Sequence, residues 1–366
     1  MLVRFQSEAQ VLTMQNTTQN KISITTNKIS FNNELRKILA NKRVVIITDE
    51  NLASHHGILT EIFVSASPVL QLFVLKPGEQ NKSFTALRKL LEKILGIWGL
   101  DRQTVVVSFG GGVITDLATV AASLLLRGLD LVHIPTSLIA QVDSAIGGKG
   151  AINSRHGKNL IGSFYQPSHV LINIPFLKTL PKKELISGYA EVVKYAAIGD
   201  KEFFLWLSRN SASLAEYNPE KLRYIVEKCA KMKSKIVAQD ASDVLGIRAL
   251  LNFGHSFAHA IEAELDYNIR HGEAVSVGMV LASELSAKLD YLSVHEVDAL
   301  ADLLRRLGLP TRISGLEAEG LLRKMERDKK MTNGSLNLVL LREIGHAFLA
   351  RQIDRQIVRQ MLVGAI

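Results

Sequence analysis

The stretch Thr104–Asp116, TVVVSFGGGVITD, decides the fold that this sequence predicts. Its first part, Thr104–Phe109, is an apolar and β-branched run without polar alternation, which is typical of a strand buried on both faces. Three glycines, Gly110–Gly112, follow this run and precede an apolar, alanine-rich helix that we expect over Asp116–Leu126. A strand, a glycine turn and a helix in this order indicate an α/β fold.

The rest of the first half repeats this pattern. We expect three more buried strands and one helix, at Arg43–Thr48, Leu70–Leu75, Leu129–Ile134 and Phe84–Leu95. Continuous apolar strands separated by helices predict a parallel sheet that is covered by helices on both faces.

The second half has helical periodicity almost throughout. The expected elements are helices over Leu185–Ala197, Leu222–Gln239, Asn252–Leu265, Glu273–Leu289 and Val294–Leu307, and a short strand over Leu336–Leu341. We therefore predict a Rossmann-like α/β domain, a candidate for dinucleotide binding, over residues 1–175 and a mainly α-helical domain over residues 176–366. The boundary lies near the two prolines of Asn173–Pro181.

Composition limits the class of protein. The chain of 366 residues is 47% hydrophobic and 22% charged, which is a globular composition and argues against a disordered protein. No apolar run reaches the ~20 residues of a membrane helix, so we expect neither a membrane span nor a secretory signal. The single cysteine, Cys229, favours a reducing, cytoplasmic location. The net charge of +9 is spread along the chain with only 6% aromatic residues, which favours a small anionic ligand over nucleic acid.

Two interpretations of Gly110–Gly112 stay open on these residues alone. Glycines between a strand and a helix let backbone N–H groups approach a phosphate at the helix N-terminus. The turn lacks the G-x-G-x-x-G spacing of the common dinucleotide fingerprint, so an ordinary tight turn is the alternative. The acidic cluster Asp49–Asn51 likewise suits either the hydroxyls of a nucleotide ribose or a solvated loop.

A second glycine-rich segment runs through Asp143–Lys149, DSAIGGK, and continues at Gly157–Asn159, GKN. Glycines beside lysines suit a loop that closes on an anion, and a flexible surface loop is the alternative.

Histidines give the sharpest signal. His255 and His259 lie at positions i and i+4 of one predicted helix, and His271 precedes the next helix. Upstream, Glu191 and Lys194 share a helix face at i and i+3. One glutamate and two histidines are a frequent ligand set for a catalytic zinc ion with an open coordination position. Ordinary capping and core histidines are the alternative.

Six runs, in order and spacing, resemble the 3-dehydroquinate synthase family over most of the chain. They are Gly110–Asp116 (GGGVITD), Gln141–Lys149 (QVDSAIGGK), Gly157–Gly162 (GKNLIG), Glu191–Lys194 (EVVK), Leu251–His259 (LNFGHSFAH) and His271–Gly278 (HGEAVSVG). The resemblance implies a dehydroquinate synthase-like fold and a lyase that needs NAD and Zn²⁺ or Co²⁺. Its reaction would convert 3-deoxy-D-arabino-heptulosonate 7-phosphate into 3-dehydroquinate and phosphate, in the shikimate pathway to chorismate and the aromatic amino acids.

The resemblance also implies roles for individual positions. The metal ligands would be Glu191, His255 and His271. The NAD site would comprise Asp49, Glu50, Asn51, Glu79, Lys82, Gly111, Gly112, Val113, Ile114, Thr115, Asp116, Thr136, Ser137, Lys149, Lys158, Phe176, Leu177, Lys178 and Thr179. The substrate would contact Asp143, Lys149, Asn159, Lys194, Lys233, Arg248, Asn252 and His259, with Lys329 or Lys330 on its phosphate. Arg127 matches an arginine that reaches into the neighbouring subunit's site, which implies a homodimer.

Two departures from the family pattern concern this site. Ala258 stands where a glycine usually precedes the second histidine, and Asp240–Gly246 is one residue longer than is typical, so Lys235 competes with Lys233 for one position. The alternative activities are an iron- or zinc-dependent alcohol dehydrogenase and a sugar phosphate cyclase acting on another sugar. A dehydrogenase would not require the cationic set of Lys149, Lys233 and Arg248. We expect the site in a cleft between the domains.

Overall fold

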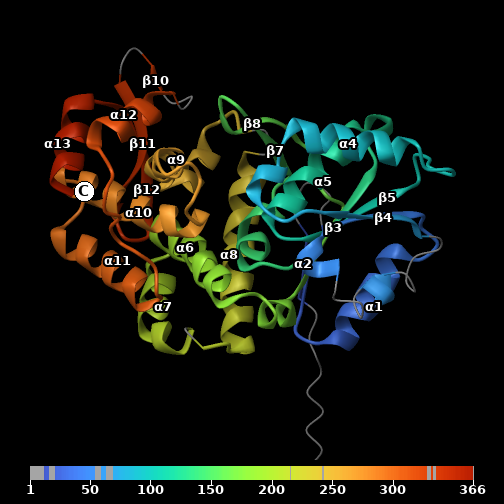
Figure 1. Ribbon diagram of the computed structural model, residues 1–366. Helices are drawn as coiled ribbons and strands as arrows, with labels where there is room; N and C mark the ends of the chain where they lie inside the picture. Colours follow the sequence, from blue (N-terminus) through green and yellow to red (C-terminus); the bar gives the residue numbers. More distant parts are fainter. Residues whose placement is uncertain are drawn as a thin grey trace, which may run out of the picture. The chain divides into compact units, whose positions relative to one another are not determined.

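The computed structural model describes residues 12–15, 21–53, 59–62, 69–214, 216–240, 243–327, 331–332 and 335–365. The chain divides into two compact units (Figure 1). The sheet unit comprises Met1–Leu180 and Leu222–Ser234, and the helical unit comprises Pro181–Lys221 and Lys235–Ile366. The middle of one long helix, α8 (Pro219–Gln239), thus groups with the sheet. The division expected from the sequence, between residues 175 and 176, places this stretch with the helices instead.

The sheet unit is built on seven strands in the order β1-β2-β9-β6-β5-β3-β4. The six strands from β2 to β4 run parallel, and β1 pairs antiparallel with β2 at one edge. Their bounds are β1 (Leu12–Gln15), β2 (Lys21–Thr25), β3 (Val44–Asp49), β4 (Val69–Leu75), β5 (Val105–Gly110), β6 (Asp130–Pro135) and β9 (His169–Asn173). This parallel sheet confirms the predicted α/β fold class.

Both faces of the sheet are buried because the apolar strands supply side chains in both directions. In β3, Val45 and Ile47 join one core cluster, while Val44 and Ile46 join the other. The first cluster includes residues of α4 (Phe84–Leu95) and α5 (Gly112–Leu124), and the second includes residues of α1 (Lys28–Leu39). Figure 1 shows α4 and α1 on opposite sides of these strands. Burial on both faces explains the unbroken apolar runs of the sequence.

The segment expected as an anion-closing loop has a different structure. A π-helical turn, η3 (Ala140–Ser144), is followed by an antiparallel hairpin of β7 (Lys149–Ser154) and β8 (Gly157–Phe164). A β-carbon at Gly150 would lie 2.4 Å from Cβ of Thr119 in α5. Glycine is therefore needed here so that β7 can approach α5, and this packing accounts for part of the glycine signal.

The helical unit surrounds α10 (His271–Lys288), which is buried along most of its length. It packs against α6, α9 and α11, and Figure 1 shows it among these helices. The other elements of this unit are α6 (Lys182–Gly199), α7 (Lys201–Leu214), η5 (Ile247–Asn252), α9 (His255–Glu264), α11 (Val294–Arg306), α12 (Ala318–Arg327), α13 (Arg355–Ala365), β10 (Met331–Thr332), β11 (Ser335–Glu343) and β12 (His346–Ile353).

The helix expected over Asn252–Leu265 is two elements, η5 and α9. Gly254 separates them with φ +77°, a left-handed conformation that glycine adopts without strain. Helix α9 therefore begins at His255, which is the first residue of the helix because of this break. Among the described residues, no helix combines the length and apolar character that a membrane span requires.

Candidate active site

The glycine turn forms the N-terminus of α5 at the carboxyl end of β5. Gly111 is the N-cap residue, and no side chain caps the first turn of the helix. A β-carbon at Gly111 would lie 3.3 Å from Ser137 Oγ, and one at Gly112 would lie 3.3 Å from Ser144 Oγ. The turn is thus bordered by two hydroxyl groups, and its glycines keep the helix N-terminus accessible to an anion.

Lys82 connects two other predicted site positions in the sheet unit. Its Nζ lies 2.5 Å from Asp116 Oδ2 and donates a hydrogen bond of 2.5 Å to Asn159 Oδ1. Lys82 is buried, and burial also raises the pKa of Asp116, an effect that the Lys82 charge opposes. The structure therefore brings two expected nucleotide residues, Lys82 and Asp116, against an expected substrate residue.

Asn153, which the sequence did not single out, extends this network. Its Nδ2 donates to Glu79 Oε1 over 2.8 Å, and its Oδ1 accepts from the Asn159 backbone N–H over 3.0 Å. Lys158 Nζ lies 3.9 Å from the same Glu79 oxygen. Asn153 belongs to β7, so this residue could have been found from the sequence only if the hairpin had been predicted.

Lys233 lies in the sheet unit beside Asp143. Its Nζ donates to the Asp143 carbonyl oxygen over 2.8 Å and forms an ion pair with the Asp143 carboxylate. Lys233 is buried, whereas Lys235 is exposed. This arrangement favours Lys233 over Lys235 as the site lysine.

The other expected nucleotide positions show local contacts. Asp49 ends β3 and accepts a hydrogen bond of 3.0 Å from the Asn51 N–H, with Glu50 between them at the start of α2 (Glu50–Ala53). Thr136 donates its N–H to the Gly110 carbonyl oxygen over 3.0 Å. Phe176, Leu177 and Lys178 lie in a 3₁₀ turn, η4 (Ile174–Lys178), and the Thr179 hydroxyl donates to the Phe176 carbonyl oxygen.

Arg127 lies at the opposite end of α5 from the glycine turn. It ends a 3₁₀ turn, η2 (Leu125–Arg127), with φ +67°. Helix α5 is thirteen residues long, which corresponds to about 20 Å between its glycine end and the end near Arg127. The expected contact of Arg127 with a neighbouring subunit stays a prediction.

The three predicted metal ligands converge in the helical unit. Glu191 of α6, His255 of α9 and His271 of α10 each offer one ligand atom, and these atoms lie within 4.8 Å of one another. His255 Nε2 is 3.5 Å and His271 Nε2 is 3.2 Å from Glu191 Oε1. One carboxylate and two imidazole nitrogens at these separations fit a divalent zinc-type ion.

The second nitrogen of each histidine has its own partner. His255 Nδ1 lies 3.2 Å from the Phe253 carbonyl oxygen, and His271 Nδ1 lies 3.2 Å from Glu262 Oε1. Both rings thereby turn Nε2 toward Glu191, which is the orientation that a metal ligand requires. Glu262 lies on the same face of α9 as His255 and His259, at i+7 and i+3, and this spacing was the signal that the sequence offered for it.

Burial and neighbouring charges shift the pKa values of the three cluster residues in different directions. Burial lowers the pKa of His255 to about 4, against the effect of Glu191. Burial would also lower the pKa of His271, but its hydrogen bonds to Glu191 and Glu262 outweigh this and raise the pKa to about 10. Burial would raise the pKa of Glu191, yet Lys194 and His255 hold it well below its usual range.

Four further expected substrate contacts lie in the same unit. Lys194 Nζ is 2.5 Å from Glu191 Oε2 and 4.9 Å from the centre of the Tyr195 ring. The His259 ring lies edge-on to His255 with centroids 5.6 Å apart. Arg248 is buried in η5, and Asn252 ends the same turn. Lys329 and Lys330 lie outside the described residues.

Asp240 shapes the loop that presents Arg248. Its Oδ1 accepts N–H hydrogen bonds from Val244 (2.8 Å) and Leu245 (3.1 Å). Its Oδ2 accepts from Ile247 (3.0 Å) and from the Arg248 N–H (3.4 Å). Burial would raise the pKa of Asp240, but these four donors outweigh it and lower the pKa.

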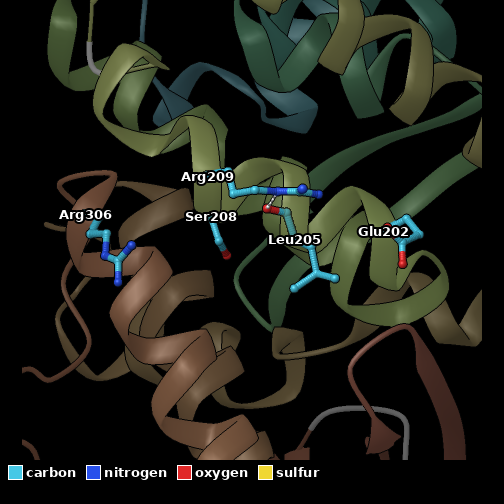
Figure 2. Close-up of a pocket in the computed structure, with 5 residues that line it drawn as sticks. All are labelled: Glu202, Leu205, Ser208, Arg209 and Arg306. Atoms are coloured by element: carbon cyan, nitrogen blue, oxygen red, sulfur yellow. Dashed lines mark hydrogen bonds between the residues drawn. The ribbon is translucent and has the colours of Figure 1, made fainter.

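Figure 2 shows a separate surface pocket, lined by Glu202, Leu205, Ser208, Arg209 and Arg306. Its two arginines are already engaged, because Arg209 donates to the Leu205 carbonyl oxygen over 3.2 Å and Arg306 pairs with Asp302. None of the predicted site residues lines this pocket. The predicted site residues therefore gather around the glycine turn and the Glu-His-His cluster, and not in this pocket.

The structure combines a parallel sheet that carries an open glycine turn with helices that hold a Glu-His-His cluster able to bind a metal ion. Family models described as 3-dehydroquinate synthase N-terminal and C-terminal match residues 72–187 and 188–331. The chain belongs to the 3-dehydroquinate synthase family. It is accordingly an enzyme of the lyase class.

Individual relatives agree with this assignment. The chain is 42% identical to 3-dehydroquinate synthase of Caulobacter vibrioides (strain NA1000 / CB15N) over 335 residues, covering 89% of this chain and 90% of the relative. It is 40% identical to the Shewanella pealeana enzyme of the same name, covering 93% and 95%. Among solved structures, 2-epi-5-epi-valiolone synthase from Streptomyces hygroscopicus subsp. jinggangensis 5008, with NAD⁺ and Zn²⁺ bound, aligns with a TM-score of 0.87 at 27% identity, covering 97% of this chain and 98% of that one.

The alcohol dehydrogenase alternative shares the fold but matches less well. An iron-containing alcohol dehydrogenase aligns with a TM-score of 0.65 at 16% identity, covering 95% of this chain and 97% of that chain. This likeness concerns the fold alone.

Proposed function

We propose that the chain converts 3-deoxy-D-arabino-heptulosonate 7-phosphate into 3-dehydroquinate and phosphate, with NAD and one Zn²⁺ or Co²⁺ ion as cofactors. The observation that carries the proposal is the convergence of Glu191, His255 and His271 within 4.8 Å in a chain of this family. A metal-and-nucleotide pair suits a reaction that oxidises an alcohol transiently, eliminates phosphate, restores the alcohol and closes a ring.

The residues fit both cofactors. The ligand set and the two supported histidines suit a zinc-type ion, and the uncapped N-terminus of α5 suits the pyrophosphate of a dinucleotide. When bound, the ion supplies Lewis-acid polarisation of a substrate hydroxyl, and NAD supplies a hydride acceptor and donor. The protein's own residues bind the anionic groups and move protons.

The substrate carries a carboxylate and a phosphate, and different cationic side chains suit each of these two anionic groups. The planar fork of Arg248 suits a carboxylate in a bidentate contact, and Asp240 holds the backbone of its loop. Lys233, which is buried beside Asp143, and Lys149 suit phosphate oxygens as point charges. Asn159 and Asn252 supply amide groups for substrate hydroxyls.

His259 is the group that we assign to proton transfer. Its ring lies edge-on to that of His255, so a hydroxyl that approaches the metal ligands also approaches the His259 imidazole, a side chain that can accept and donate a proton. Lys194 next to Glu191 adds a positive charge that favours an oxyanion at this point.

Phosphate release from the heptulosonate phosphate tests the activity directly. With deuterium on the carbon that is oxidised, we expect the label at the same carbon of the product and no accumulation of NADH, because the hydride returns within one turnover. Stoichiometric NADH release would instead identify an alcohol dehydrogenase. Turnover of a different sugar phosphate alone would identify another cyclase.

We also propose that the chain works in the cytoplasm as a homodimer. The one cysteine, Cys229, is buried and suits a reducing compartment, and the family resemblance of Arg127 supports a subunit contact. Light scattering after size-exclusion chromatography tests the dimer, and a mass of one chain would contradict it.

A further inference from the structure

Glu262 stands directly behind a metal ligand. It is only 1% exposed on α9, and its Oε1 lies 3.2 Å from His271 Nδ1. On the opposite side of the same imidazole ring, Nε2 lies 3.2 Å from Glu191 Oε1. We propose that Glu262 is a positioning residue for the metal centre, which fixes the ring orientation of His271 and raises its affinity for the ion. This inference rests on the metal site of the proposed function.

The argument begins with the two nitrogens of imidazole. A neutral ring carries one proton, and only the nitrogen without it can bind a metal ion. A carboxylate at Nδ1 accepts that proton in a hydrogen bond, so Nε2 of His271 keeps its lone pair and stays directed toward Glu191. The negative charge of Glu262 also makes the ring a stronger donor to a divalent cation.

The two histidine ligands differ in this support. His255 Nδ1 faces the Phe253 carbonyl oxygen, which is a neutral dipole, whereas His271 Nδ1 faces a full negative charge. The His271 side chain is also the more exposed of the two, at 34% against 11%. A more exposed ligand has fewer packing contacts to hold its ring, so the charged hydrogen bond matters most there.

The burial of Glu262 points to the same role. A carboxylate with 1% exposure costs free energy unless charged or polar partners compensate it. An alanine at this position of α9 would avoid that cost and favour the helix. His271 is one such compensating partner, because its Nδ1 lies 3.2 Å from Glu262 Oε1, and the buried charge thereby acts on this ligand.

The test compares metal binding by Glu262→Gln and Glu262→Ala with a matched control. Glu264→Gln changes a carboxylate on the same helix that pairs with Lys324 over 2.6 Å, away from the histidines. Full-length protein, stripped of metal, is titrated with Co²⁺ against a competing chelator, and the visible spectrum of the bound cobalt is recorded. Thermal unfolding of the metal-free forms verifies that each variant is folded.

We expect about tenfold weaker Co²⁺ binding for Glu262→Gln and up to about 100-fold weaker binding for Glu262→Ala, each with an altered cobalt spectrum. Gln has the smaller effect because its carbonyl oxygen still accepts the Nδ1 proton. Glu264→Gln should match the wild type.

Unchanged affinity and spectrum in folded Glu262→Gln would overturn the proposal while leaving the proposed function intact, and this variant decides the matter if Glu262→Ala does not fold. A wild-type protein that binds no cobalt would overturn the metal centre itself, and both proposals with it.

Discussion

Gly272 and Ser187 are in direct contact where α10 meets α6. The Gly272 N–H donates to the Ser187 hydroxyl over 3.0 Å, and a β-carbon at position 272 would lie 1.9 Å from the Ser187 carbonyl oxygen. Glu191 follows Ser187 by one helical turn, and His271 immediately precedes Gly272. This contact therefore sets the separation of two candidate metal ligands, Glu191 and His271.

Replacing Gly272 with alanine should force the two helices apart. We expect Gly272→Ala to lower the free energy of unfolding by about 1–3 kcal/mol, as overpacking does, and to weaken Co²⁺ binding. Gly364→Ala near the end of α13 is the control, because no described residue lies within 4 Å of a β-carbon there, and we expect no loss of stability. Equal effects of the two substitutions on cobalt binding would show that the contact does not position the ligands.

Removal of the metal ion should abolish activity. We expect a chelator to inactivate the enzyme and Zn²⁺ or Co²⁺ to restore it, since Glu191, His255 and His271 are the converging ligand set. His271→Ala should lower the metal content measured by atomic emission, because two remaining ligands hold zinc poorly. Full activity in a rigorously metal-free preparation would contradict the assignment.

Arg248→Leu should separate substrate binding from NAD binding. Losing a charged hydrogen bond in a buried site costs ~1.5–3 kcal/mol, so we expect KM for the substrate to rise by about 10- to 150-fold. The Kd for NAD, measured by calorimetry, should stay close to the wild-type value. Lys235→Leu is the control, because Lys235 is exposed. Equal weakening of both ligands by Arg248→Leu would assign Arg248 a structural role.

Asp240→Asn should disturb the loop of Arg248 in a pH-dependent way. An asparagine nitrogen would donate where two backbone N–H groups already point, so we expect a higher KM for the substrate and lower stability. The folded-state pKa of Asp240 is lowered, so its stabilising contribution is complete above the unfolded pKa of about 3.9 and is lost as pH falls through the folded pKa. The stability gap between wild type and variant should therefore close in acid. A gap in urea midpoint that is constant from pH 7 to pH 3 would contradict this account.

The sequence predicted the parts of the fold that are locally encoded. The apolar runs of β3, β4, β5 and β6 and the glycines after β5 mark the sheet without tertiary information. The hairpin of β7 and β8 was not predicted because its Gly150 serves a contact with Thr119, which is distant in sequence. Strands β2 and β9 were missed because they are only five residues long and are defined by their pairing.

The candidate site was predictable to a similar extent. Glu191, His255 and His271 are residue types that zinc sites use, the two histidines stand beside glycines, and the structure brings all three together. The hydrogen bond between Lys82 and Asn159 joins positions 77 residues apart, so no local pattern contains it. Glu262 shares a helix face with two histidines, but a single glutamate on a helix is too common to stand out.

Because β5 alternates between two apolar cores, Gly110 has a part in fixing the register of this strand, beside the buried contact of Ser108 with His133. Val105, Val107 and Phe109 belong to one core and Val106 to the other, so a slip by one residue would exchange side chains of nearly equal hydrophobicity. The burial of apolar side chains therefore distinguishes the two strand registers only weakly. Position 110 distinguishes them, because even a β-carbon there would lie 2.6 Å from Ile114, and a slip that brought Phe109 to this point would collide with α5. The first glycine of the Gly110–Gly112 turn therefore also fixes the position at which strand β5 ends.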